Sequence, residues 1–204
     1  MTHWEQFEKE KLTKLFTDKK DILDIGGGLR IDRNKNNRFN PKSTWLQELA
    51  AKVNYRILDK VSDYNPDIVG DIHNLPLADN SQDAIICIAV LEHVEDPFKA
   101  MQEIYRVLRP GGYLYAFVPF LYYYHPEKDY YGDYWRFTSE GITNLTKKFT
   151  STEMVNVRGS LESVSYLIPM PRKNIVQRIT RNIDRLAHKE ITQQTSGFNF
   201  FCIK

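Results

Sequence analysis

Short apolar runs alternate with amphipathic segments along the first 120 residues. Apolar side chains recur at helical spacing from Trp4 to Phe16, opposite charged residues, and predict an N-terminal helix within residues 1–19. Runs rich in β-branched residues predict strands, and further amphipathic segments predict helices between them. The predicted strands are 21–25, 55–59, 68–69, 84–89 and 113–120, and the predicted helices are 45–52 and 98–108. This alternation predicts a parallel, doubly wound α/β sheet with right-handed crossovers.

The regular alternation of predicted strands and helices ends after the fifth predicted strand. A polar and aromatic loop at 121–137 follows, and the segment 119–138 around it holds six of the twelve tyrosines. A helix at 139–148, capped by Thr138 or Ser139, comes next. A strand at 154–157, a helix at 174–188 and a strand at 198–203 complete the chain. The pattern therefore predicts seven strands.

Composition narrows the class of protein. A length of 204 residues favours one domain, and a net charge of +2 does not favour non-specific nucleic-acid binding. Cys87 and Cys202 lie inside apolar runs, which favours buried thiols in a reducing compartment over a disulfide framework. The first 16 residues contain no continuous hydrophobic stretch, so we expect neither a secretory signal nor a membrane span, and a cytoplasmic location.

Glycines and carboxylates follow the predicted strands at the points where those strands end. Gly26–Gly28 end the first strand, Asp59 the second and Asp71 the third. In open α/β sheets, ligands bind beyond the carboxyl ends of the strands. One carboxylate there can accept the hydroxyls of a ribose and another an exocyclic amine, so the pattern predicts an adenosine site. Ile31 replaces the third glycine of a dinucleotide fingerprint, and no phosphate-binding P-loop motif occurs.

Five blocks of sequence, at 22–28, 70–77, 80–84, 91–97 and 106–112, resemble class I S-adenosylmethionine-dependent methyltransferases. The resemblance is to the small-molecule group with L-P-L and R-V-L-R-P-G-G motifs. It implies a single Rossmann-like domain with a seven-stranded sheet, mostly parallel, whose last strand is antiparallel. The cofactor implied is S-adenosylmethionine.

The same resemblance implies roles for individual residues. Glycines of the turn let the methionine portion approach, Asp24 supports its ammonium, Asp59 holds the ribose, and Asp71 with the Ile72 amide reads adenine. The cofactor-binding set implied is Asp24, Gly26, Gly27, Gly28, Asp59, Asp71, Ile72, Ala89 and Leu91.

The chain departs from this family's pattern after the glycine turn. Arg30 stands where the family usually has a third glycine, and a polar stretch inserted at 29–43 delays the following helix. Asp24 and Asp59 are 35 residues apart, against roughly 20 in a compact βαβ unit. We expect this stretch either to lie over the cofactor or the substrate entrance, or to be a disordered excursion.

Candidate catalytic groups follow the fourth and fifth predicted strands. Methyl transfer from a sulfonium is an in-line displacement that needs a base only when the acceptor loses a proton. Glu92, His93 and His125 are the candidates; His93 could instead be a structural imidazole. Some relatives hold a divalent metal here with two glutamates and a histidine, but Ala89 removes the first glutamate, so we expect no metal.

The aromatic loop is the predicted acceptor site, and its sequence loosely resembles methyltransferase-like proteins of bacterial surface-glycan pathways. Tyr124 and Trp135 can stack on a sugar or ring, and Arg136 can pair with a carboxylate or phosphate, which favours an anionic, hydroxyl-bearing acceptor. Alternatively, Arg136 pairs with Asp133 or Asp129 to hold a lid, and the tyrosines pack or dimerise.

Together these patterns favour O-methylation of a small molecule or glycan intermediate by a monomer or homodimer. The alternatives are N- or C-methylation of a small molecule, or a non-catalytic binding protein that keeps the fold. The basic amphipathic helix at 172–189 either presents a solvated outer face or contacts a membrane surface or polyanion.

Overall fold

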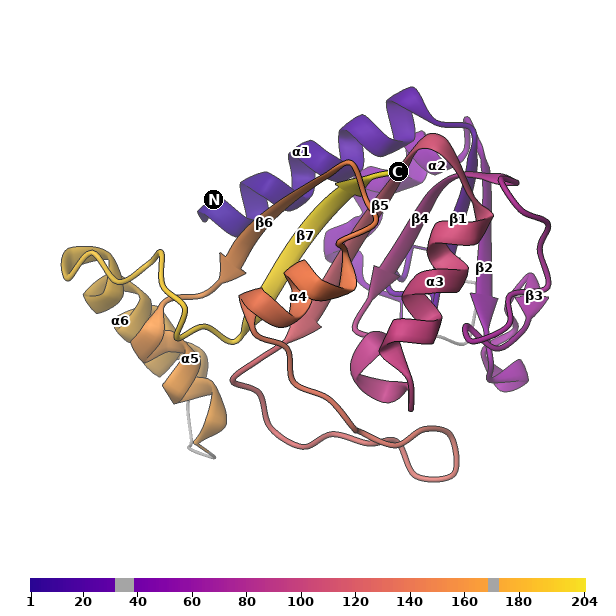
Figure 1. Ribbon diagram of the computed structural model, residues 1–204. Helices are drawn as coiled ribbons and strands as arrows, with labels where there is room; N and C mark the ends of the chain where they lie inside the picture. Colours follow the sequence, from indigo (N-terminus) through magenta and orange to yellow (C-terminus); the bar gives the residue numbers. More distant parts are fainter. Residues whose placement is uncertain (32–38, 169–172) are drawn as a thin grey trace.

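A seven-stranded sheet forms the centre of the molecule (Figure 1). The computed structural model describes residues 1–31, 39–168 and 173–204. The strand order is β3-β2-β1-β4-β5-β7-β6, and only β7 runs antiparallel to its neighbours, which confirms the predicted fold class. The strands are β1 (Asp21–Ile25), β2 (Asn54–Asp59), β3 (Ile68–Val69), β4 (Gln82–Ile88), β5 (Leu108–Pro119), β6 (Ser151–Val157) and β7 (Gly197–Ile203).

Helices cover both faces of this sheet, with α1 on one side and α3 and α4 on the other (Figure 1). Side chains alternate along a strand, so successive residues of β4 enter different cores: Ile85 and Cys87 face α3, whereas Ala84 and Ile86 face α1. The helices are α1 (His3–Asp18), α2 (Gln47–Ala50), α3 (Pro97–Val107), α4 (Ser139–Leu145), α5 (Ser160–Leu167) and α6 (Lys173–Leu186), with 3₁₀ turns η1 (Pro41–Leu46), η2 (Ser62–Tyr64) and η3 (Leu91–His93).

Two elements differ from the sequence expectation in their extent. β5 begins at Leu108, which already pairs with Gln82, and continues through the Arg109–Gly112 segment expected to separate helix from strand. Arg109 holds this segment on the sheet by ion pairs with Asp21 and Asp83, at 2.9 and 2.6 Å. The helix expected at 45–52 is shorter: η1 ends at Leu46, and only the four residues of α2 are α-helical.

Helix α5 was not predicted, because its polarity is the reverse of an ordinary amphipathic helix. Glu162, Ser163 and Ser165 are buried, whereas Leu161 and Val164 are 44% and 48% exposed. Asp184 of α6 caps the first turn of α5 by accepting hydrogen bonds from the backbone amides of Leu161 and Glu162. The helix therefore depends on a tertiary contact that local periodicity does not encode.

Helix α6 also turns polar groups inward. Asp184 is buried, and Arg181 forms a 2.6 Å ion pair with buried Glu162. The predicted apolar stripe consequently faces outward; its members, Ile175, Ile179, Ile183 and Leu186, are between 44% and 82% exposed. Within the parts of the chain described here, no helix combines the length and apolar character needed to cross a bilayer.

Candidate functional site

The carboxyl ends of β1 to β4 border one cavity of about 350 Å³. Each strand contributes its last residues or the turn that follows, as expected for a parallel sheet. Six of the nine expected cofactor-binding residues line the cavity: Gly26, Gly28, Asp59, Asp71, Ile72 and Ala89. Asp24, Gly27 and Leu91 do not line it.

The glycine turn is required by the close approach of β1 to the end of β4. Gly26 has a φ of +78°, and a Cβ there would lie 2.5 Å from Val90 Cγ2. A Cβ on Gly28 would lie 2.6 Å from Ile88 Cβ and 2.9 Å from the Ile88 carbonyl oxygen. These two positions exclude side chains and thereby leave backbone exposed to the cavity.

Asp24 lies below the turn and stabilises it. Its carboxylate is fully buried and accepts hydrogen bonds from the Gly28 and Leu29 amides and, at 2.6 Å, from the Tyr55 hydroxyl. Burial raises the pKa of Asp24 to about 6, despite these hydrogen bonds. This placement corrects the expected direct contact with the cofactor ammonium, because the carboxylate supports the loop from the core side.

Asp59 and Asp71 are fixed by the loops that follow β2 and β3. Asp59 accepts a hydrogen bond from the Val61 amide at 2.9 Å. Asp71 accepts from the His73 amide and faces the His73 ring nitrogen at 2.7 Å, and Lys60 lies 3.6 Å away. Partial burial raises the pKa of Asp71, but the His73 contacts and the Lys60 charge outweigh it and lower the pKa below its usual value. Asp71 is thus held as a carboxylate beside the cavity.

Two non-glycine residues beside the cavity adopt left-handed backbone conformations. Arg30 and Ala89 both have φ near +54°, a region that carries strain outside glycine. The conformation of Arg30 explains why a glycine suits this position. The neighbouring Leu91 was expected to bind cofactor, but it is fully buried and belongs to the core on the α3 side of the sheet.

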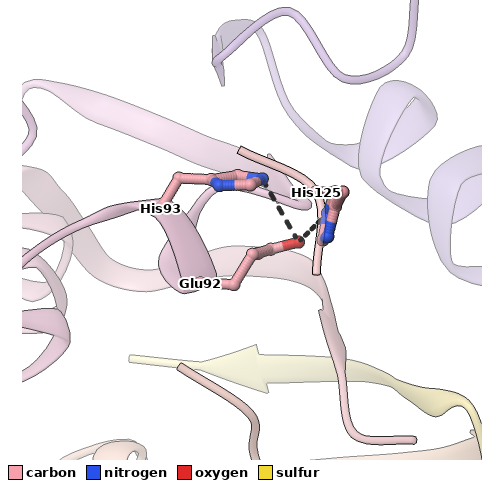
Figure 2. A group of neighbouring side chains, drawn as sticks. All are labelled: Glu92, His93 and His125. Atoms are coloured by element: carbon pink, nitrogen blue, oxygen red, sulfur yellow. Dashed lines mark ion pairs between the residues drawn. The ribbon is translucent and has the colours of Figure 1, made fainter. Parts of the chain in front are cut away.

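Glu92, His93 and His125 form a cluster at the edge of the cavity (Figure 2). Glu92 and His93 belong to η3, His125 comes from the loop after β5, and His93 lines the cavity. Glu92 Oε1 lies 3.9 Å from Nε2 of each histidine. The two imidazole rings meet edge to face with their centroids 4.8 Å apart. The structure thus brings together the three residues predicted as catalytic.

Burial governs the protonation of this cluster. Glu92 is 1% exposed, and burial raises its pKa to about 8. Burial also lowers the pKa of His93, although the hydrogen bond to the Gly132 carbonyl opposes this effect. His93 is therefore neutral at physiological pH, with its Nε2 lone pair free to accept a proton.

The aromatic loop crosses the cavity as a strap, residues 121–137, fixed by Asp133 and Arg136. Arg136 binds both oxygens of Asp133, at 2.6 and 2.8 Å, and donates its other N–H groups to the carbonyls of Tyr122, Tyr123 and Trp135. All five guanidinium donors are used within the strap. The expected pairing of Arg136 with an anionic acceptor is therefore wrong, and the lid-holding alternative is supported.

The other two expected acceptor residues also lie away from the cavity lining. Tyr124 is 74% exposed. The Trp135 indole donates to the Val94 carbonyl at 2.9 Å and thus fastens the strap to the segment after η3. Both residues were chosen for aromatic character alone, which does not distinguish a stacking surface from a structural anchor.

The strap contributes different residues to the cavity: Tyr130, Tyr131, Gly132 and Tyr134. Tyr130 donates a hydrogen bond to Asp63 at 2.9 Å, and its ring lies near that of Tyr64 in η2, so the strap reaches across to the β2 side of the cavity. The sequence identified the loop but not these positions, because no local pattern indicates which tyrosines turn inward.

The polar stretch 29–43 is described at its two ends only. Residues 32–38, on which the expectation of a cover over the site mainly rested, lie outside the described residues. The ends are joined by a backbone hydrogen bond from the Asn40 amide to the Arg30 carbonyl, at 2.9 Å. Arg30 itself lines the cavity.

Comparison with known proteins identifies a family model and solved structures that this chain resembles. The family model described as "Methyltransferase domain" matches residues 31–116. The fold aligns with a SAM-dependent methyltransferase from Archaeoglobus fulgidus over 98% of this chain and 94% of that one, with a TM-score of 0.59 and 14% identity. The sequence thus resembles methyltransferases over residues 31–116, and the whole fold is that of S-adenosylmethionine-dependent methyltransferases. The cofactor of this family is S-adenosylmethionine.

Two curated relatives share part of the sequence. An uncharacterized protein of Methanocaldococcus jannaschii is 34% identical over 105 residues, covering 50% of this chain and 43% of the relative. A ubiquinone/menaquinone biosynthesis C-methyltransferase of Haemophilus ducreyi is 33% identical over 102 residues, covering 46% of this chain and 39% of the relative. The chain therefore spans less than half the length of these two proteins.

The cavity fits the family's cofactor in its chemistry. A turn without side chains at Gly26 and Gly28 leaves room for the methionine portion, and two fixed carboxylates, Asp59 and Asp71, offer acceptors for ribose hydroxyls and an exocyclic amine. His93 borders the same space. The parts that would hold the cofactor and the groups that would act on the acceptor thus share one cavity.

Proposed function

We propose that the protein transfers a methyl group from S-adenosylmethionine to an oxygen of a small molecule or glycan intermediate. The observation that carries this proposal is the shared border of the cavity. Asp59 and Asp71 lie at the β2 and β3 ends, and His93 lies at the β4 end beside Glu92 and His125. The proposal thus assigns cofactor binding to the strand ends and acceptor activation to this cluster.

The residues of the chain would act mainly by alignment. S-adenosylmethionine supplies an electrophilic methyl group, and the attack on it needs the acceptor oxygen in line with the departing sulfur. Neutral His93 offers a lone pair for the acceptor's proton, and its hydrogen bond to Gly132 fixes the ring. The Tyr134 amide of the strap donates a hydrogen bond to the Glu92 carbonyl of η3 at 2.8 Å. Held in this way, the strap would limit the entry of water.

The proposed acceptor need not be anionic, since Arg136 is occupied by Asp133. Rings of Tyr131 and Tyr134 border the cavity and suit stacking on a sugar or other ring. A hydroxyl-bearing ring compound is therefore the acceptor class we propose. Transfer to carbon, the reaction named for the Haemophilus ducreyi relative, is the second candidate, because it would use the same cofactor site and the same base.

Calorimetry with S-adenosylmethionine is the direct test of the proposal. Saturable binding by the wild type is expected. Asp59→Ala should weaken it about five- to 150-fold, corresponding to about 1 to 3 kcal/mol for lost hydrogen bonds. Asp79→Ala is the matched control, because Asp79 is 69% exposed and pairs with Arg106 away from the cavity lining. Absence of binding at millimolar cofactor would refute an enzyme and favour a non-catalytic binding protein.

The acceptor is tested separately with a product assay. The wild type is incubated with the cofactor and a panel of nucleotide sugars, phenols and their O-blocked counterparts, and formation of S-adenosylhomocysteine is measured. O-methylation predicts turnover that disappears when the hydroxyl is blocked. Turnover that persists with a blocked hydroxyl would favour attack by carbon or nitrogen instead.

A peripheral contact with anionic lipid is also part of the proposal, together with a cytoplasmic location. The exposed isoleucines of α6 have basic neighbours in Arg178, Arg185 and Lys189, an arrangement suited to a negatively charged membrane surface. Vesicles of phosphatidylserine and phosphatidylcholine should sediment the wild type, and Ile179→Asp should abolish this. Equal sedimentation by phosphatidylcholine alone, or concentration-dependent dimers that Ile179→Asp disrupts, would contradict the lipid assignment.

A further inference from the structure

The geometry points to a divalent transition-metal site formed by Glu92 Oε1 and the Nε2 atoms of His93 and His125. One ligand atom from each residue lies within 4.8 Å of the others, and Oε1 lies 3.9 Å from each Nε2. Figure 2 shows all three side chains converging on a common point from two separate segments.

Both histidines are held in the tautomer that a metal needs. His93 Nδ1 lies 2.7 Å from the Gly132 carbonyl oxygen, and His125 Nδ1 lies 2.9 Å from that of Tyr123. A carbonyl only accepts hydrogen bonds, so Nδ1 carries a proton in both rings and Nε2 is the ring atom left to bind a metal. Such outer hydrogen bonds to backbone carbonyls are typical of metal-ligating histidines.

Glu92 lacks the partners that a buried carboxylate requires. It is 1% exposed, and neither carboxyl oxygen has a hydrogen-bond partner among the described residues. A buried polar group without a partner costs free energy, and a buried charge costs more. The two Nε2 atoms that face Oε1 lie 3.9 Å away, too far for a hydrogen bond. A cation at the centre would form a favourable bond with each of the three ligand atoms.

The ligand set indicates the kind of ion. Two imidazoles and one carboxylate suit Zn²⁺, Fe²⁺, Co²⁺ or Mn²⁺ better than Mg²⁺ or Ca²⁺, which prefer oxygen ligands. Zinc bonds of about 2.0 to 2.2 Å place tetrahedral ligands roughly 3.4 Å apart. The two 3.9 Å separations therefore need to contract by about 0.5 Å, and the separation of the two imidazole nitrogens, within 4.8 Å, by up to about 1.4 Å. Three protein ligands also leave at least one coordination position open.

This site differs from the metal arrangement considered from the sequence. That arrangement needed a glutamate at position 89, where this chain has alanine. Here the third ligand is His125, supplied by the strap rather than by the segment after β4. The strap position is fixed by the Asp133 carboxylate, which accepts a hydrogen bond from the His125 amide at 2.8 Å and binds Arg136. Asp133 and Arg136 are therefore positioning residues for the proposed site.

The role of the ion rests on the proposed methyl transfer. With the ion bound, His93 Nε2 is a ligand, and the ion replaces His93 as the group that activates the acceptor. An acceptor hydroxyl bound at the open position would lose its proton to solvent more readily, since a bound cation lowers the pKa of a coordinated hydroxyl. The oxygen would form a bond to the cofactor methyl carbon while the carbon–sulfur bond breaks. Its electron pair would remain on sulfur, which becomes a neutral thioether.

Metal binding is measured without any turnover. Chelator-treated protein is dialysed against ZnCl₂ and titrated separately with CoCl₂, whose visible bands report its coordination. We expect one Zn²⁺ per chain, bands of a four- or five-coordinate Co²⁺ site, and a thermal midpoint that rises with ZnCl₂ concentration. Glu92→Gln and His125→Gln should each weaken affinity at least about tenfold and abolish the bands.

His188→Asn is the matched control, because His188 is an exposed histidine after α6 and asparagine tolerates its left-handed backbone. It should bind both ions like the wild type. Wild-type protein without stoichiometric Zn²⁺, or Glu92→Gln with undiminished affinity, would overturn the proposal. The thermal midpoint of metal-free Glu92→Gln shows that this variant folds. Zinc binding without methyl transfer would refute the proposed function alone, whereas cofactor binding without zinc binding would refute the metal site alone.

Discussion

Replacement of Arg136 by methionine separates its structural role from the acceptor-binding role expected from sequence. Arg136 donates two charge-assisted hydrogen bonds to Asp133, whose side chain is fully buried, and three to backbone carbonyls of the strap. Methionine keeps much of the length of the side chain but donates nothing. The variant therefore removes the guanidinium from a buried carboxylate and three carbonyls. Asp133 and the Tyr123 carbonyl then keep only their contacts with His125.

The expected loss of stability follows from the same ion pair by two routes. The Arg136 hydrogen bonds lower the pKa of Asp133 from an ordinary 3.8 to about 2, which corresponds to about 2 to 3 kcal/mol of stability at neutral pH. Removing one partner of a buried pair typically costs about 3 to 5 kcal/mol. The Arg136 side chain is 26% exposed, so we expect a stability loss at the low end of this range. We expect about 3 kcal/mol.

Urea unfolding at pH 7 measures this loss, and calorimetry measures affinity for S-adenosylmethionine in the same variants. Arg136→Met should also weaken cofactor binding, because the strap lines the cavity through Tyr130–Tyr134. Arg185→Met, at an exposed position of α6, is the control and should change stability by less than about 0.5 kcal/mol. Normal stability in Arg136→Met together with a raised KM for an acidic acceptor would refute the structural role and restore the acceptor contact.

Two further predictions concern the turn after β1. Gly28→Ala should destabilise the protein by about 1 to 3 kcal/mol and weaken cofactor binding, since its Cβ would lie 2.9 Å from the rigid Ile88 carbonyl; unaltered unfolding in urea would contradict this. Asp24 has a pKa of about 6 in the folded protein against 3.8 in the unfolded chain. The stability that proton binding by Asp24 contributes is therefore present below pH 4 and is lost as the pH rises through 6. The stability of Asp24→Asn relative to wild type should therefore rise between pH 4 and pH 7, by up to about 3 kcal/mol, and a difference independent of pH would contradict the raised pKa.

Much of the sheet could be predicted from the sequence because the strands are nearly continuous apolar runs. The β1 and β3 bounds agree with the predicted 21–25 and 68–69, and β2 begins one residue before its predicted 55–59. β1 is largely buried, and each of the three strands ends in aspartate or is followed directly by glycine, so the strand ends leave a local signal. Their carboxyl ends then share one edge by topology alone, which explains why Asp59 and Asp71 were found.

What the sequence could not reveal depends on contacts between distant segments. Helix α5 has its apolar residues outward, and Asp184 from α6 supplies its cap. Asp24 and Leu91 stand in motif positions, but both are fully buried. Their burial depends on tertiary packing, which a local motif does not encode. Arg136 presented an even choice between acceptor and lid, and only the position of Asp133 decides it.

The cluster of Glu92, His93 and His125 shows how chemistry arises from such distant packing. Adjacent Glu92 and His93 are by themselves a weak sequence signal for a functional site. His125 lies in a loop, where a single histidine can equally have a structural role. Two backbone carbonyls, from Tyr123 and Gly132, orient both rings so that their Nε2 atoms face the Glu92 carboxyl group, which has no hydrogen-bond partner in the described parts of the chain. Because the strap supplies both carbonyls and one of the rings, anything that loosens the strap should disperse the three ligands together. The Arg136→Met variant consequently links the two arguments: it should lose Zn²⁺ affinity in the folded protein although Arg136 contributes no ligand atom.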